Sequence, residues 1–350
     1  MTDLRATANR PVFFERNRVR RVYDGGMLFG DFLGDEKKDG KFPEEWIASS
    51  VKALNRDNSD PREGLSVIEG TDITFKELLE KEKRACLGDR EQLGILVKYL
   101  DSAVRLPIQA HPDKEFSRRH FKSEFGKTEV WLVLGVRPGA KIYFGFNRRV
   151  TQKEFSAAVE KSGTDKDIMT GFLREVPVKT GDVFFIPPKC VHAIGYGCLI
   201  LEIQEPTDFT LQPEYWCGDY PLNEYEMYLG LSKEAALSCF DFNICGKKSE
   251  SLTKKNPMPL SKNDGYISES LVSYADTPCF AVNRHTVTGE FPLNNAPSVW
   301  VVADGEGEIT GQNYSRAVKK GGYFFLPYSA KGFSVRANGA VTLVECLPPE

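Results

Sequence analysis

The sequence lacks the features of a secreted, membrane-spanning or disulfide-stabilised protein. No apolar run approaches the roughly 18 residues that a membrane helix needs, and no apolar segment of signal-peptide length follows the arginine-rich residues 1–26. The eight cysteines include no Cys-x-x-Cys pair, which argues against a disulfide framework and against a cysteine-type zinc site. We therefore expect a cytoplasmic protein with reduced, mostly buried thiols.

An excess of charge of one sign is also missing. The 46 basic and 49 acidic side chains leave a formal net charge of −3, so the chain as a whole has no attraction for nucleic acid or an anionic membrane. We expect neither as a partner, and any anionic ligand must be held by a few local cations. The 350 residues, at about 150 residues per domain, predict roughly two domains.

Short runs rich in Val, Ile, Phe and Tyr follow one another from residue 107 onward and are separated by Gly and Pro. Four of these runs are residues 131–136, 141–146, 183–186 and 199–203. This pattern predicts an all-β barrel or sandwich. Two helical insertions are expected, at about 74–103, where Thr74 and Glu77 form a capping-box pattern, and at about 151–173.

One motif occurs twice. Residues 179–187 read KTGDVFFIP and residues 319–327 read KKGGYFFLP, with five identical positions. The repeat predicts two β domains of one architecture. We place them at residues 1–239 and 263–350, joined by a polar, irregular linker at 240–262.

Only four histidines occur, and two of them stand in patterns that suit a metal ion. Gln109 and His111 are two residues apart, so on a strand they share a face. Glu129 opens a later predicted strand, and His192 follows another. Two imidazoles, a carboxylate and an amide oxygen suit a divalent ion such as zinc. By spacing alone, a structural role for these residues stays open; His120 is expected to be solvated and His285 structural.

Four segments, in this order, carry a family resemblance. They are QAHPDK (109–114), KTEVW (127–131), GDVFFIPPKCVHAIG (181–195) and LEIQEPTD (201–208). Together they resemble the type I mannose-6-phosphate isomerases, which are zinc enzymes of the cupin superfamily. The resemblance implies a mainly β protein of two cupin (jelly-roll) domains, with the metal in the first. In the second motif copy, Gly332 stands where His192 stands in the first, so that domain is expected to be metal-free.

The resemblance also implies the residues of the site. One Zn²⁺ per chain would be bound by Gln109, His111, Glu129 and His192. Catalytic positions fall on Lys127 and Gln212, and Lys98 matches a family lysine of the substrate pocket. Lys114 and Lys189 lie near the ligand segments, so we predict that they bind substrate as well; a solvated surface charge is the alternative for each. Glu202 and Asp208 would orient ligands or substrate hydroxyls. The implied reaction interconverts mannose 6-phosphate and fructose 6-phosphate by proton transfer through an enediol-like intermediate, in a monomer or homodimer.

Two positions depart from the family pattern. Pro107 replaces a serine found in many members, and Gln212 replaces an arginine, which removes a permanent charge and a bidentate donor. Either another cation binds the substrate phosphate, with Arg118, Arg119 and Lys189 as the candidates, or phosphorylated hexose is handled less well. Two alternatives stay open: an isomerase with a different sugar substrate, and a catalytically inactive sugar-phosphate-binding cupin.

Overall fold

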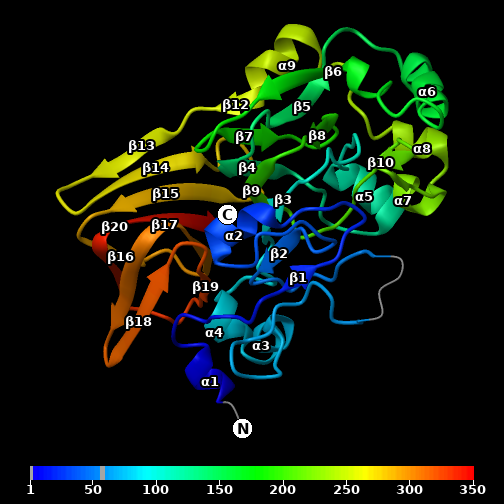
Figure 1. The fold of residues 1–350 in the computed structure, drawn as a ribbon. Helices are drawn as coiled ribbons and strands as arrows, with labels where there is room; N and C mark the ends of the chain where they lie inside the picture. The colour runs from blue at the N-terminus through cyan, green and yellow to red at the C-terminus, as the bar shows by residue number, and fades with distance from the viewer. Residues whose placement is uncertain (1–2, 56–59) are drawn as a thin grey trace.

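The computed structural model describes residues 3–55 and 60–350, and it is mainly β (Figure 1). In Figure 1 the C-terminal strands, in yellow to red, form one side of the molecule, and the N-terminal strands with their helices form the other. A shared apolar cluster joins the two parts, since Val130 and Leu132 of the first belong to the same buried cluster as Val299 and Phe325 of the second. The expected mainly β, cupin-type architecture is confirmed.

Among the described residues, the N-terminal part contains a seven-stranded sheet in the order β1-β2-β3-β9-β4-β7-β12, a three-stranded sheet β6-β5-β8 and the small pair β10-β11. The strands are β1 (Arg18–Val19), β2 (Glu44–Ile47), β3 (Leu96–Asp101), β4 (Glu129–Val136), β5 (Lys141–Phe146), β6 (Leu173–Pro177), β7 (Val183–Ile186), β8 (His192–Ile194), β9 (Cys198–Gln204), β10 (Trp216–Cys217), β11 (Tyr220–Pro221) and β12 (Lys254–Lys255).

The C-terminal part is an eight-stranded sheet in the order β13-β14-β15-β20-β17-β18, with β16 paired to β20 and β19 paired to β17. The strands are β13 (Met258–Lys262), β14 (Tyr266–Val272), β15 (Ala281–Val287), β16 (Glu290–Pro292), β17 (Ser298–Gly311), β18 (Tyr314–Lys319), β19 (Tyr323–Leu326) and β20 (Ser334–Leu347).

Short helices surround the N-terminal strands. They are α1 (Leu4–Thr7), α2 (Met27–Leu33), α3 (Phe75–Lys81), α4 (Lys83–Leu87), α5 (Lys114–Phe121), α6 (Gln152–Lys161), the 3₁₀ turn η1 (Thr170–Phe172), α7 (Glu224–Tyr228), α8 (Lys233–Leu237) and α9 (Gly246–Thr253). The capping box at α3 forms as predicted: the Glu77 amide donates to Thr74 Oγ1, and the Thr74 amide donates to the Glu77 carboxylate. The insertion expected at 151–173 is the helix α6 followed by turns and η1.

Two local expectations were wrong. The helix predicted for 74–103 extends only to Leu87, because residues 96–101 form the strand β3. This strand pairs with β2 and β9, and all six of its residues are buried. A strand buried on both faces reads as a continuous apolar run, which periodicity alone does not separate from a helix. The segment 240–262, expected to be irregular, contains α9, β12 and β13; β12 and β13 lie at sheet edges, where polar residues are tolerated. The domain boundaries themselves remain a prediction.

The repeated motif forms equivalent strands in the two parts. Its copies contribute β7 and β19, and the register places Trp131 opposite Phe184 in the first sheet and Trp300 opposite Phe324 in the second. In the same register Glu129 lies opposite Ile186, and Ser298 lies opposite Leu326. Ser298 therefore occupies, in the second part, the position that Glu129 occupies in the first.

Candidate metal centre

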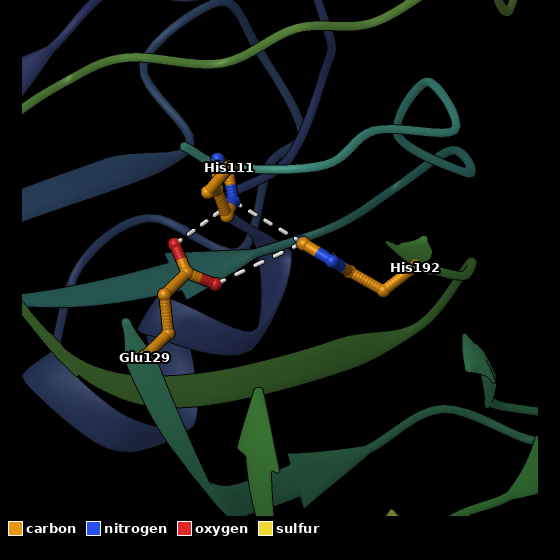
Figure 2. Close-up of side chains that lie close together, drawn as sticks. All are labelled: His111, Glu129 and His192. Carbon is orange, nitrogen blue, oxygen red and sulfur yellow. Dashed lines mark hydrogen bonds and ion pairs between the residues drawn. The ribbon is translucent and has the colours of Figure 1, made fainter. Parts of the chain in front are cut away.

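Three buried side chains converge between the two sheets of the N-terminal part. Glu129 begins β4, His192 begins β8, and His111 follows a short bridge in which Gln109 pairs with His192. Figure 2 shows the two imidazoles and the carboxylate pointing toward one another. His111 Nε2 lies 3.2 Å from His192 Nε2 and 3.1 Å from Glu129 Oε1, and His192 Nε2 lies 3.9 Å from Glu129 Oε2. The three side chains are at most 1% exposed, so they face a common point out of contact with bulk water.

The hydrogen bonds on the outer side of the rings fix their tautomers. Nδ1 of His111 lies 2.9 Å from the Phe209 carbonyl oxygen, and Nδ1 of His192 lies 2.9 Å from the Cys190 carbonyl oxygen. Because a carbonyl only accepts, each Nδ1 carries the proton and each Nε2 presents a lone pair. Burial lowers the pKa of both rings, that of His192 to about 3, so both rings are neutral near pH 7.

The donor set therefore fits a metal cation. Two imidazole lone pairs and a carboxylate face one another, and none of them supplies a proton to the others. Glu129 Oε1 accepts no hydrogen bond among the described residues, although Lys127 Nζ lies 2.9 Å away. Lys127 Nζ also lies 3.4 Å from His111 Nε2, so its ammonium group supplies part of the positive charge that the buried carboxylate and the acceptor nitrogens favour, and a cation at their common point would supply the rest. These three residues could hold a metal ion, and their ligand atoms lie within 4.8 Å of one another.

Gln109, the fourth predicted ligand, lies beside the three. Its Nε2 is 3.4 Å from His192 Nε2, and its amide N–H donates to the His192 carbonyl oxygen. The oxygen and nitrogen of a side-chain amide exchange places by a half-turn, and that half-turn would aim Oε1 at the other acceptors. The structure thus brings all four predicted ligands together.

A cavity of about 280 Å³ adjoins this cluster. Gln109, Lys127 and Glu202 line its buried end, and Lys98, Pro107 and Gln212 also line it. Of the predicted cationic residues, Lys114 and Lys189 do not line it: they lie 3.8 Å from Glu205 and Asp113 respectively. Arg118 and Arg119 also lie elsewhere, since both are exposed and pair with Glu124 and Glu115 on or beside α5.

The cavity is linked to the metal ligands through a tryptophan. The Trp131 indole N–H lies 2.8 Å from Glu202 Oε1 and 3.1 Å from Glu129 Oε2, so one donor serves both carboxylates. Lys98 Nζ lies 2.8 Å from Glu202 Oε2 and 3.7 Å from Glu44. Burial, reinforced by the charge of Glu129, raises the pKa of Glu202 to about 7, and Lys98 opposes that shift.

Sequence reasoning missed Arg21 and Glu44, which line the same cavity. The Arg21 guanidinium makes two hydrogen bonds of 3.1 Å to Asp208 and two more to Glu44. Burial opposes the charge on Glu44, but Arg21 and Lys98 outweigh it and hold the pKa of Glu44 well below its usual range. No local sequence motif predicts this cluster, because its members are far apart in the sequence.

No helix among residues 3–55 and 60–350 is long and apolar enough to cross a membrane.

Both a family model and curated relatives show similarity to mannose-6-phosphate isomerases. The family model for the mannose-6-phosphate isomerase cupin domain matches residues 271–345. Mannose-6-phosphate isomerase ManA of Bacillus subtilis is 28% identical over 333 residues, which are 93% of this chain and 95% of the relative. The mannose-6-phosphate isomerase of Streptococcus mutans is 27% identical over 92% of this chain and 94% of the relative.

Solved structures show the same fold. The crystal structure of the mannose 6-phosphate isomerase from Bacillus subtilis superposes with a TM-score of 0.76 at 22% identity, covering 96% of this chain and 99% of that one. A mannose 6-phosphate isomerase bound with zinc and yttrium superposes with a TM-score of 0.72 at 15% identity, covering 96% and 99%. The resemblance to the mannose-6-phosphate isomerases is confirmed, and the expected enzyme class agrees with these relatives.

Proposed function

We propose that this chain is a zinc-dependent aldose-ketose isomerase that interconverts mannose 6-phosphate and fructose 6-phosphate. The observation that carries the proposal is the convergence of His111, Glu129 and His192 beside a cavity. Lys98 and Lys127 line that cavity, and Lys127 Nζ lies 2.9 Å from Glu129 Oε1. A pure metal-storage or structural site would not need a cavity lined by lysines beside it. The names of the relatives and the zinc in one of the solved isomerases support the same reaction.

The metal ligands we propose are His111, Glu129, His192 and, after rotation of its amide, Gln109, with one Zn²⁺ per chain. Two imidazoles with a carboxylate are a ligand set that zinc favours. When bound, the ion would polarise the sugar oxygens at the reacting carbons and stabilise negative charge there. Backbone groups orient two of these ligands, since the carbonyl oxygens of Phe209 and Cys190 accept from the Nδ1–H groups of the His111 and His192 rings.

The residues proposed to act on the substrate lie where the cavity meets this cluster. Lys127 Nζ is 2.9 Å from Glu129 Oε1 and 3.4 Å from Thr210 Oγ1, and it faces the cavity. A cation there would stabilise a developing enediolate oxygen. Glu202 and Lys98 form a buried acid–base pair 2.8 Å apart on the same wall, within reach of a sugar carbon that enters the cavity. Gln212 lines the cavity and would contact the substrate through its amide.

A coupled assay tests this proposal. Zinc-loaded protein is supplied with mannose 6-phosphate, and fructose 6-phosphate formation is followed; unphosphorylated mannose and other aldose phosphates are run in parallel. We expect turnover with mannose 6-phosphate that exceeds the turnover of every other sugar. Turnover confined to another sugar would favour a related isomerase, and binding without any turnover would favour an inactive sugar-phosphate-binding cupin; either result refutes the proposal.

A further inference from the structure

Most of the cations in the cavity are already neutralised by protein carboxylates. Arg21 has five N–H donors, and all five are used: Nε donates to Glu44, Nη1 to Asn55 and Asp208, and Nη2 to Glu44 and Asp208. Arg21 therefore has no donor left for a ligand. It is a positioning residue, which fixes the two carboxylates beside Lys98.

The two lysines at the buried end, Lys98 and Lys127, also form ion pairs with protein carboxylates. Lys98 lies between Glu202 and Glu44, and Lys127 lies beside Glu129, so neither carries unbalanced charge. Neither of the two departures from the family pattern places a cation in the cavity lining. Pro107 has no N–H, and Gln212 donates its side-chain amide to the Glu226 carbonyl oxygen at 2.8 Å.

Two cations remain at the exposed rim of the cavity, among the described residues that line it: Arg20 and Lys41. They come from neighbouring backbone segments, because the Arg21 amide donates to the Lys41 carbonyl oxygen at 2.9 Å. The backbone at Arg20 is held by Glu63, which accepts from its amide, and by Asn55, which donates to its carbonyl oxygen. No protein carboxylate pairs with the Arg20 guanidinium in the part of the chain that the structure describes.

Lys41 has two partners: its Nζ donates to the Val22 carbonyl oxygen at 3.0 Å and to one carboxylate, which is exchangeable. Its Nζ lies 3.0 Å from Asp24, and the two side chains are 43% and 44% exposed. A surface pair of this kind contributes about 0–1 kcal/mol, so a phosphate dianion can compete for the ammonium group.

We propose that Arg20 and Lys41 bind the phosphate group of the substrate at the rim, in place of the arginine that Gln212 replaces. This inference rests on the proposed function, because it assumes a phosphorylated sugar whose reacting end points to His111, Glu129 and His192. It assigns phosphate recognition to the N-terminal segment of the chain, on residues that neither the sequence motifs nor the predicted site contained.

The test uses Arg20→Gln, Lys41→Gln and the double variant, with Lys37→Gln as the matched control. Lys37 is a cation of the same segment, its side chain is 62% exposed, and it does not line the cavity. The dissociation constants of mannose 6-phosphate and of mannose are measured by calorimetry on the metal-loaded full chain, and turnover is measured separately. Each single variant should weaken mannose 6-phosphate binding about tenfold, which corresponds to about 1.4 kcal/mol, and leave mannose binding, metal content and melting temperature unchanged.

Inorganic phosphate gives a second readout. It should compete with mannose 6-phosphate in the unsubstituted protein and in Lys37→Gln, and this competition should be lost in the double variant. Equal weakening of both sugars, or unchanged binding of mannose 6-phosphate in the double variant, would overturn the inference. The proposed function is tested separately: if it is wrong, the unsubstituted protein shows no turnover, whatever the binding data show.

Discussion

Trp131 connects the candidate metal ligands to the cavity, and Trp300 provides an internal comparison for it. Its indole N–H serves Glu129 and Glu202, while the indole N–H of Trp300, at the equivalent position of the second sheet, donates to Ser298 at 2.8 Å. Both side chains are fully buried. At equivalent positions, the indole N–H therefore contacts two buried carboxylates in the first sheet and a serine hydroxyl in the second.

Replacing Trp131 by Phe should weaken metal binding. The change keeps an aromatic ring but removes the donor that orients Glu129, and loss of such a supporting contact typically costs about 10–100-fold in metal affinity. Trp300→Phe makes the same chemical change away from the ligands. A competition titration with a chromogenic chelator should show weaker affinity in the first variant only; equal affinities in both variants would show that the indole does not support the site.

Replacing Gln212 by Arg should raise the efficiency with which the protein uses mannose 6-phosphate. Gln212→Arg places a permanent positive charge on the wall of the cavity that contains Gln212, beside the Glu226 carbonyl oxygen. We expect a lower KM for mannose 6-phosphate and a several-fold higher kcat/KM in the coupled assay, with Gln212→Lys intermediate because lysine lacks the bidentate fork. Unchanged or lower efficiency would indicate that the substrate phosphate does not approach this wall.

The predictability of the site differs from residue to residue. Gln109, His111, Glu129 and His192 lie in short motifs whose order is visible in the sequence, and the structure brings them together. Arg21 could not be found this way, because its partner Asp208 is 187 residues away and the contact depends on the packing of the N-terminal segment. Lys114 and Lys189 lie close in sequence to the predicted ligands, yet they lie outside the cavity, because closeness along the chain does not fix the direction of a side chain.

At the scale of elements, the four apolar runs expected to be strands are confirmed, because they lie in β4, β5, β7 and β9. The helix α3 begins at its predicted capping box, and the repeated motif forms β7 and β19. The central strand β3 was misread as helix because its side chains are buried on both faces of the sheet, which removes the alternation of polar and apolar residues. Only pairing with distant segments defines such a strand.

The capping box at α3 gives a stability prediction. Thr74→Ala removes the oxygen that accepts from the Glu77 amide, and loss of an N-cap side chain costs about 1 kcal/mol. Thr74→Ser keeps the oxygen and should retain most of the stability. Urea unfolding should show a lower midpoint for the alanine variant with unchanged isomerase activity; a midpoint equal to that of the unsubstituted protein would mean that the cap adds nothing to the packed helix.

At the scale of the whole molecule, two related sheets have taken different roles. They share a buried cluster, and buried polar contacts cross between them: Tyr99 donates to the Gly321 carbonyl oxygen, and Tyr323 donates to Glu45. The second sheet keeps the tryptophan and its phenylalanine partner but has Ser298 where the first has Glu129. We infer that the second sheet supports the first, while the chemistry is confined to the N-terminal part.

In the proposed mechanism, isomerisation depends on an ion bound between His111, Glu129 and His192. The most direct measurement is to remove metal with a chelator and titrate Zn²⁺ back while following fructose 6-phosphate formation, in the unsubstituted protein and in His192→Ala. We expect activity to rise in proportion to added zinc up to one ion per chain, and we expect His192→Ala to stay inactive throughout. Full activity in the metal-depleted protein, or recovery in His192→Ala, would contradict the proposed mechanism.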